Sequence, residues 1–123
     1  MTLTICLRTL RSFIIRLTFN DNSFDTVVDT FGLEYCINPK KVIDEMRRVC
    51  KKDGLILILA SGMPSSPYLQ YYYRWRQPLL LGKYGKFNTR DWNKIIKSYD
   101  FDVINEKRFL NGSVYLYILK NNK

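Results

Sequence analysis

The chain has 123 residues, of which 46% are hydrophobic and 25% are charged, a balance typical of one folded domain rather than a disordered chain. It contains no histidine, which excludes Ser-His and Cys-His nucleophile pairs and every histidine-ligated zinc site. Its 20 basic and 11 acidic residues give a net charge of +9, which attracts anions such as nucleic acid, phospholipid headgroups and nucleotides without choosing among them.

The cysteines are three in number, Cys6, Cys36 and Cys50, and none forms a Cys-x-x-Cys pair. We therefore expect neither a disulfide framework nor a metal site. Reduced cysteines favour an intracellular location, either cytoplasmic or mitochondrial.

Residues 1–19 differ in composition from the rest of the chain, because they include Arg8, Arg11 and Arg16 but no acidic residue. An arginine-rich, acid-free start is typical of a mitochondrial presequence. The alternatives are a half-buried strand or helix, or a start other than the native one. We leave 1–19 unassigned and place the folded domain at 20–123.

A strand, a helix and a second strand are predicted within the next 40 residues. Residues 24–31 are rich in β-branched and aromatic side chains, as in a strand. Asn38 is a suitable N-cap before Pro39, and the apolar stripe that follows predicts an amphipathic helix ended by Gly54. The continuous apolar run at 55–60 indicates a strand buried on both faces, so the three elements form a βαβ unit.

An aromatic insert at 61–88 interrupts this pattern, because its three prolines are incompatible with one long helix. Its aromatic residues alternate with arginines. They could enclose a flat or lipidic small molecule, meet a membrane surface through 68–76, or stack on nucleic-acid bases. The plainest structural interpretation is a lid packed over the sheet.

The last third of the chain predicts a helix and a hairpin. Apolar spacing indicates a helix over 92–99 with Thr89 as its N-cap, followed by strands at 101–109 and 113–119 around the hairpin turn Asn111-Gly112. The fold class is therefore α/β, with a mixed sheet, helices on its faces and an antiparallel terminal hairpin. The polar tail after the last strand is expected to be solvated.

Four short sequence words carry a family resemblance: LTFNDNSFD at 17–25, FGL at 31–33, EMRRV at 45–49 and KDG at 52–54. In this order and spacing they resemble the class I S-adenosylmethionine-dependent methyltransferases, in the type 11 branch that includes ubiquinone/menaquinone C-methyltransferases. The corresponding motifs of that family read L-P-F-x-D-N-x-F-D, F-G-L and E-x-x-R-V-L-K-P-G-G. Thr18 replaces its proline, and Lys-Asp-Gly replaces its Pro-Gly-Gly turn.

The resemblance implies the carboxyl-terminal part of a Rossmann-like fold. The family binds S-adenosylmethionine on a glycine-rich loop after its first strand, whereas this sequence has no glycine before Gly32. We expect a chain truncated before that loop and inactive or impaired alone. Strand 24–31, central in the full sheet, would then be an aggregation-prone edge unless residues 1–19 pair with it as a substitute.

Cofactor residues follow from the same resemblance, which places the methionine end of S-adenosylmethionine at Thr30, Phe31, Gly32 and Leu33. Strand alternation turns the neighbouring Asp29 to the other face of the sheet. A carbon or hydroxyl acceptor would need a base, for which Glu34 or a tyrosine of the insert could serve, and no catalytic residue is assigned.

The leading hypothesis is a methyltransferase acting on a small-molecule, quinone-precursor or lipid acceptor. One alternative is a non-catalytic methyltransferase-like partner of a full-length enzyme. The other is a basic nucleic-acid or membrane-surface binder, with nucleic acid the less favoured of the two.

Overall fold

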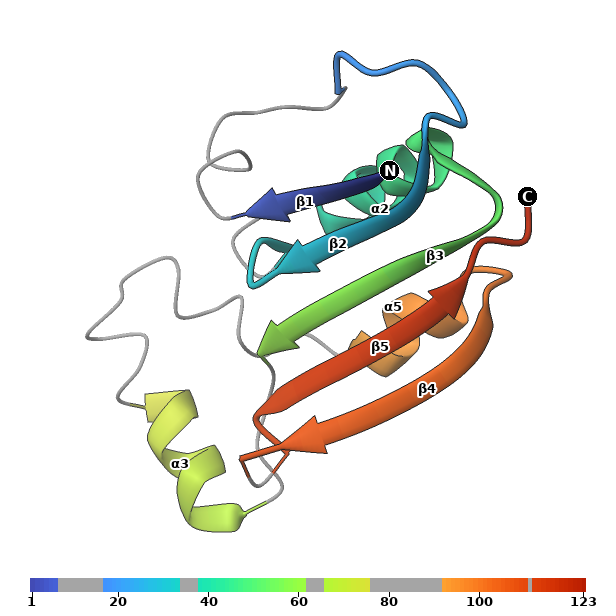
Figure 1. Cartoon of the computed structure of the whole chain (residues 1–123). Helices are drawn as coiled ribbons and strands as arrows, with labels where there is room; N and C mark the ends of the chain where they lie inside the picture. The colour runs from blue at the N-terminus through green and yellow to red at the C-terminus, as the bar shows by residue number, and fades with distance from the viewer. Residues whose placement is uncertain (7–16, 34–37, 62–65, 76–91, 111) are drawn as a thin grey trace.

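The computed structural model describes residues 1–6, 17–33, 38–61, 66–75, 92–110 and 112–123. Within these ranges Figure 1 shows one sheet with helices behind it and one helix beyond its lower left corner. The elements in chain order are β1 (Thr2–Cys6), β2 (Phe24–Thr30), α2 (Pro39–Val49), β3 (Cys50–Ser61), α3 (Pro67–Trp75), α5 (Trp92–Lys97), β4 (Asp102–Phe109) and β5 (Val114–Lys120).

The sheet has five strands in the order β1-β2-β3-β5-β4 (Figure 1). Strands β1, β2 and β3 are parallel, whereas β5 pairs antiparallel with both β3 and β4. The predicted βαβ unit, mixed sheet and terminal hairpin are thereby confirmed. The hairpin turn includes Gly112 at φ 81°, in the left-handed region that glycine favours.

Strand β1 corrects the expectation that 24–31 would be a sheet edge. It pairs parallel with β2 from Thr2 opposite Thr26 to Cys6 opposite Thr30. The expectation that the first 19 residues could supply a substitute strand is confirmed. Because β2 is hydrogen-bonded on both sides, the aggregation hazard predicted for it is removed.

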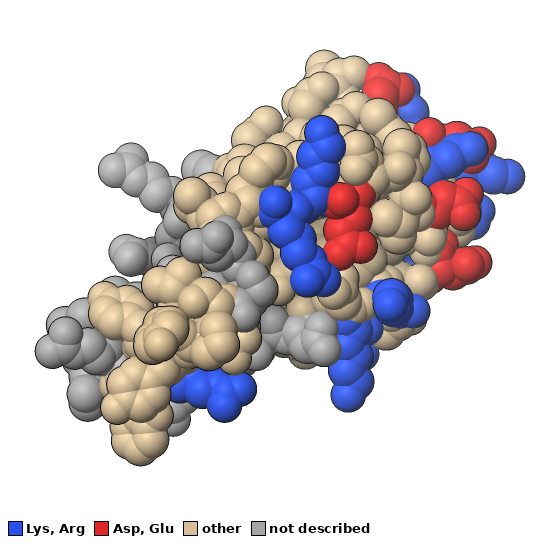
Figure 2. All heavy atoms as spheres, turned by 90° about the horizontal axis from the view of Figure 1, so that it is seen from below, with Lys and Arg blue, Asp and Glu red and all other residues tan. Residues whose placement is uncertain are grey.

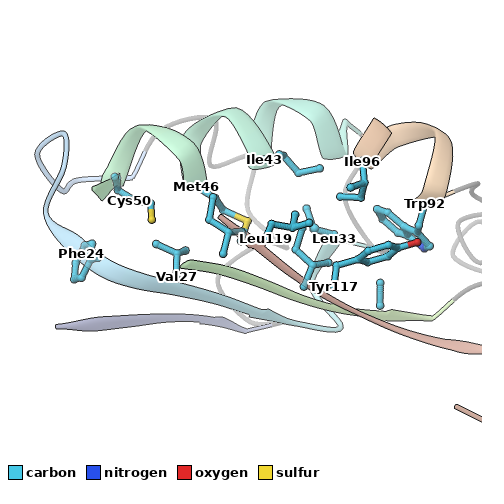
Figure 3. Packing of buried hydrophobic residues seen from close by; sticks show 14 residues of the cluster. Phe24, Val27, Leu33, Ile43, Met46, Cys50, Trp92, Ile96, Tyr117 and Leu119 are labelled. Carbon is cyan, nitrogen blue, oxygen red and sulfur yellow. The ribbon is translucent and has the colours of Figure 1, made fainter. Parts of the chain in front are cut away.

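Two helices, α2 and α5, pack on the same face of the sheet (Figures 1 and 3). Between them and the strands lies a core that includes Val27, Met46, Trp92, Tyr117 and Leu119 (Figure 3). In the described part of the chain, no helix covers the opposite face. That face carries a row of half-buried apolar side chains from β2, β3 and β5: Val28, Leu57, Leu59, Leu116 and Ile118.

The junction between α2 and β3 differs from the prediction. Asn38 caps the helix by accepting from the Lys41 backbone N–H at 3.4 Å, as expected, but α2 ends at Val49 and β3 begins at once. The left-handed residue is Asp53, at φ 61°. Gly54 is required for another reason, because a Cβ there would lie 2.7 Å from the Asp25 carbonyl oxygen.

The carboxyl-terminal tail is not solvated as expected, because Asn121 is fully buried. Its side-chain amide donates to the carbonyl oxygens of Arg47, Cys50 and Lys51 at 3.1, 3.1 and 3.2 Å. These carbonyls include those left without an intrahelical partner where α2 ends. Asn121 thus joins the last strand to the α2–β3 junction.

Helix α3 corrects the lid interpretation. Its aromatic side chains Tyr68, Tyr71, Tyr72 and Trp75 are exposed to solvent, whereas a lid over the sheet would bury them. The remainder of the insert, including Arg76, lies outside the described residues, as does the predicted N-cap Thr89. No helix in the described ranges is long and apolar enough to cross a membrane.

A polar cluster fixes the chain's entry into β2. Arg48 donates to the Glu45 carboxylate at 2.6 and 2.9 Å, to Asp21, and to the carbonyl oxygens of Leu17 and Phe19 at 3.1 and 2.9 Å. Glu45 also accepts from the Leu17 N–H at 2.7 Å. Hydrogen bonds to Glu45 and then Asp21 hold the pKa of Arg48 above its ordinary value. Two of the family words are therefore in direct contact.

Removing Glu45 tests the strength of this cluster. The Glu45 side chain is only 12% exposed, so Glu45→Ala leaves the Leu17 N–H without its acceptor and Arg48 without the carboxylate to which it donates two hydrogen bonds. We expect the free energy of unfolding in urea to fall by about 2 kcal/mol. Asp100→Ala, which removes an exposed carboxylate, is the control and should change stability by less than about 0.5 kcal/mol. Equal effects of the two changes would contradict the assignment.

Candidate functional site at the carboxyl edge of the parallel strands

The carboxyl ends of β1, β2 and β3 meet at one edge of the sheet (Figure 1). Cys6 at the end of β1 pairs with Thr30 at the end of β2, and Thr30 pairs in turn with Leu59 on β3. In open α/β sheets, ligands bind outside the carboxyl ends of parallel strands. The chain leaving β2 is described as far as Leu33, so its first turn can be examined in detail.

That turn begins with a strained residue. Phe31 has φ 53°, a left-handed conformation that a bulky side chain rarely adopts. Its N–H donates to the Leu59 carbonyl at 2.8 Å, which extends the β2–β3 ladder by one bond and holds the residue in place. Strained backbone conformations persist only where surrounding contacts hold them, and they are concentrated at functional sites. The chain consequently leaves the sheet sharply after Thr30.

A buried carboxylate supports the turn from beneath. Asp29 is fully buried and lies on the helix-covered face with Val27, as alternation predicted. Its Oδ2 accepts from the Leu33 N–H at 3.2 Å. This positioning role was not found from the sequence. A carboxylate within an apolar strand was nonetheless a usable signal, because burying a charge requires hydrogen-bond partners.

The four predicted cofactor residues lie together but present different groups. Thr30 and Phe31 are half-buried at the strand end, and Gly32 is buried immediately after them. Leu33 is fully buried and its side chain belongs to the core (Figure 3), so only its backbone is available to the turn. Of these four residues, Thr30 and Phe31 therefore keep part of their surface exposed.

The residues proposed as bases are not brought to this edge by the described structure. Glu34 lies outside the described residues, and Tyr68, Tyr71 and Tyr72 of α3 are exposed to solvent. Across the described ranges, no group of three or more His, Cys, Asp or Glu side chains could hold a metal ion.

Comparison with known proteins identifies the family. The profile described as "Methyltransferase domain" matches residues 4–58, which span β1, β2, α2 and most of β3. Over residues 4–58 the chain is therefore similar to this methyltransferase family. The match includes part of the segment 1–19 that composition alone left unassigned.

Related sequences agree with this methyltransferase assignment. Over 75 residues the chain is 36% identical to the ubiquinone/menaquinone biosynthesis C-methyltransferase of Legionella pneumophila, covering 61% of this chain and 30% of that enzyme. Over 57 residues it is 40% identical to the demethylmenaquinone methyltransferase of Clavibacter sepedonicus, covering 46% of this chain and 23% of that enzyme. The chain described here thus spans under a third of the length of these relatives.

Solved structures confirm the fold. A Bacillus halodurans protein superposes with a TM-score of 0.68 at 15% identity, over 89% of this chain and 75% of that protein. An S-adenosylmethionine-dependent methyltransferase of Aquifex aeolicus gives a TM-score of 0.61 at 14% identity, over 89% of this chain and 52% of that enzyme. The mixed five-stranded sheet therefore has the same fold as these proteins.

The residues at this edge can be compared with the two ends of S-adenosylmethionine. Thr30 offers a hydroxyl at the carboxyl edge, a group able to bond to the polar methionine end. The Asp29 carboxylate is buried and bonded to Leu33, so it is not placed to accept the ribose hydroxyls. The sequence also contains no glycine before Gly32 that could form the family's loop.

Asp29→Ala tests whether the buried carboxylate holds the turn. Losing the acceptor leaves the Leu33 N–H unsatisfied beneath the core, which should lower the free energy of unfolding by about 1–3 kcal/mol. Amide hydrogen exchange at Leu33 should accelerate more than exchange in β5. Asp29→Asn keeps an acceptor oxygen and should remain closer to the wild type. If Asp29→Ala left exchange at Leu33 unchanged, the positioning role would be wrong.

Proposed function

We propose that this protein takes part in S-adenosylmethionine-dependent methyl transfer, with the turn from Thr30 to Leu33 lining the methionine end of the cofactor's site. One observation carries the proposal. The strained turn at Phe31 and its support by Asp29 fall at the carboxyl edge of the parallel strands, inside the segment that matches the methyltransferase profile.

Methyl transfer requires of the protein mainly that it position the methyl donor and the acceptor. S-adenosylmethionine supplies a methyl group on a positively charged sulfur, and transfer forms a bond from the acceptor to the methyl carbon as the sulfur–carbon bond breaks. Holding the two reactants in line supplies much of the rate. The fixed turn at Phe31 is suited to that task, because its backbone is held by Leu59 and its following loop by Asp29.

The acceptor we propose is a quinone precursor. The names of the Legionella and Clavibacter relatives support this choice, since both enzymes are named for quinone methylation. Methylation of a ring carbon releases one proton from that carbon, so a base is needed. Glu34 follows the turn directly in the sequence and is the residue we propose for it.

The second candidate function is that of a non-catalytic partner of another methyltransferase chain. The observation that favours it is the apolar sheet face carrying Val28, Leu57 and Ile118, which no helix in the described ranges covers. Doubly wound sheets are normally covered on both faces. A second chain could supply that cover together with the missing glycine-rich loop.

A pair of matched substitutions tests the cofactor site. Thr30→Val removes one hydroxyl at the carboxyl edge, whereas Thr26→Val makes the same change on the same strand and face about 13 Å away. In equilibrium dialysis with radiolabelled S-adenosylmethionine, the wild-type chain should bind weakly but saturably. Thr30→Val should weaken binding about 2- to 10-fold, the value of one hydrogen bond, and Thr26→Val should leave it unchanged.

The outcomes of this experiment separate the proposals. Equal binding by both variants would contradict the site, and a folded chain that binds no cofactor would favour the non-catalytic partner. Adding a demethylated menaquinol in detergent tests the acceptor, because label should then appear in the organic extract. Cofactor binding without transfer to this quinol would reject the quinone precursor while leaving the cofactor site intact.

A further inference from the structure

Helix α3 carries an exposed aromatic stripe, consisting of Tyr68, Tyr71, Tyr72 and Trp75. Their spacing of i, i+3, i+4 and i+7 puts them on one face of the helix. Tyr68 is 88% exposed, Tyr71 67% and Trp75 65%. The rings of Tyr71 and Trp75 lie 6.2 Å apart between centroids, so these two rings are direct neighbours.

The exposure of this stripe contrasts with the other tryptophan of the chain. Trp92 is 1% exposed and donates its indole N–H to the Ser61 carbonyl at 2.8 Å. A contiguous exposed aromatic surface on a helix marks an interaction site rather than ordinary surface variation. Tyrosine and tryptophan combine an apolar ring with a polar group, which suits them to the boundary between lipid tails and headgroups.

The sequence on either side of the stripe carries charge of one sign. Between Asp53 and Asp91 the sequence contains no acidic residue, but it contains five basic ones: Arg74, Arg76, Lys83, Lys86 and Arg90. Helix α3 itself carries Arg74 in its last turn. In Figure 1, α3 projects beyond the corner of the sheet, and Figure 2 shows its uncharged surface beside a single blue group. The exposed face of α3, with Arg74, is accessible and complementary to a negatively charged surface.

We propose that α3 lies in the interface of an anionic lipid bilayer, with the aromatic stripe turned toward the acyl chains and Arg74 among the headgroups. A lipid surface fits better than nucleic acid, because phosphate contacts dominate nucleic-acid binding and α3 carries one cation against five aromatic residues. This proposal stands on α3 alone and does not depend on methyl transfer.

Vesicle flotation tests the proposal directly. The full chain is mixed with vesicles of phosphatidylcholine alone or with about one-third phosphatidylglycerol. The chain should float with the anionic vesicles and much less with the neutral ones. The double variant Tyr71→Ala, Trp75→Ala should partition about tenfold or more weakly, because it loses two interfacial rings. Phe109→Ala, which removes a 46% exposed ring from β4, is the matched control and should float like the wild type.

Fluorescence supplies a readout that does not depend on a destabilised variant. Trp75 emission should shift to shorter wavelength when anionic vesicles are added. In Trp75→Phe, the remaining Trp92 is buried and should show no shift. Flotation of the double variant equal to that of the wild type would overturn the proposal. So would absence of binding to anionic vesicles, or binding to single-stranded RNA or to a protein through α3 with no affinity for vesicles.

Discussion

The parallel register of β1, β2 and β3 is the constraint on which the rest of the structure depends. It brings Cys6, Thr30 and Leu59 side by side, so that three loops leave the sheet at one edge. The Arg48–Glu45 cluster fixes where the chain enters β2, at the opposite end of the same strand. The turn at the carboxyl edge and the polar contacts at the amino end of β2 are therefore joined by the ladder between them.

The two faces of the sheet serve different purposes. The face toward α2 and α5 contains the core and also the buried Asp29 carboxylate. This carboxylate holds the following turn by accepting a hydrogen bond from the Leu33 N–H. The opposite face offers half-buried aliphatic side chains and Thr30. Burial of Asp29 costs free energy, and the hydrogen bond to the Leu33 backbone offsets part of that cost. Structure and candidate site are thus coupled through adjacent residues of one strand.

Local patterns predicted most of the fold. The N-cap Asn38 with Pro39, the apolar run of β3 and the Asn111-Gly112 hairpin are short-range signals, since each depends on a few neighbouring residues. The family words at 17–25 and 45–49 were found as separate motifs. Their contact through Arg48 could not be found that way, because it joins residues about 30 positions apart.

The remaining features depend on long-range packing. Strand β1 was ambiguous because a short run of threonine and aliphatic residues becomes a strand only when β2 offers it an edge. Asn121 resembled a solvated tail residue, and its burial follows from the carbonyls left open at the end of α2. The exposure of Tyr68 and Trp75 could not be predicted, since helical aromatic spacing is the same for a core face and a docking face.

Chemical-shift mapping of the backbone amides during titration with S-adenosylmethionine tests the central claim most directly, and a chain of 14.7 kDa is well suited to it. The account predicts the largest shifts at Thr30, Phe31, Gly32 and Leu33, with little change at Thr26 on the same strand. Largest shifts on α3 or at the β4–β5 hairpin, or no shifts at saturating cofactor, would contradict the assignment of the carboxyl edge as the cofactor site.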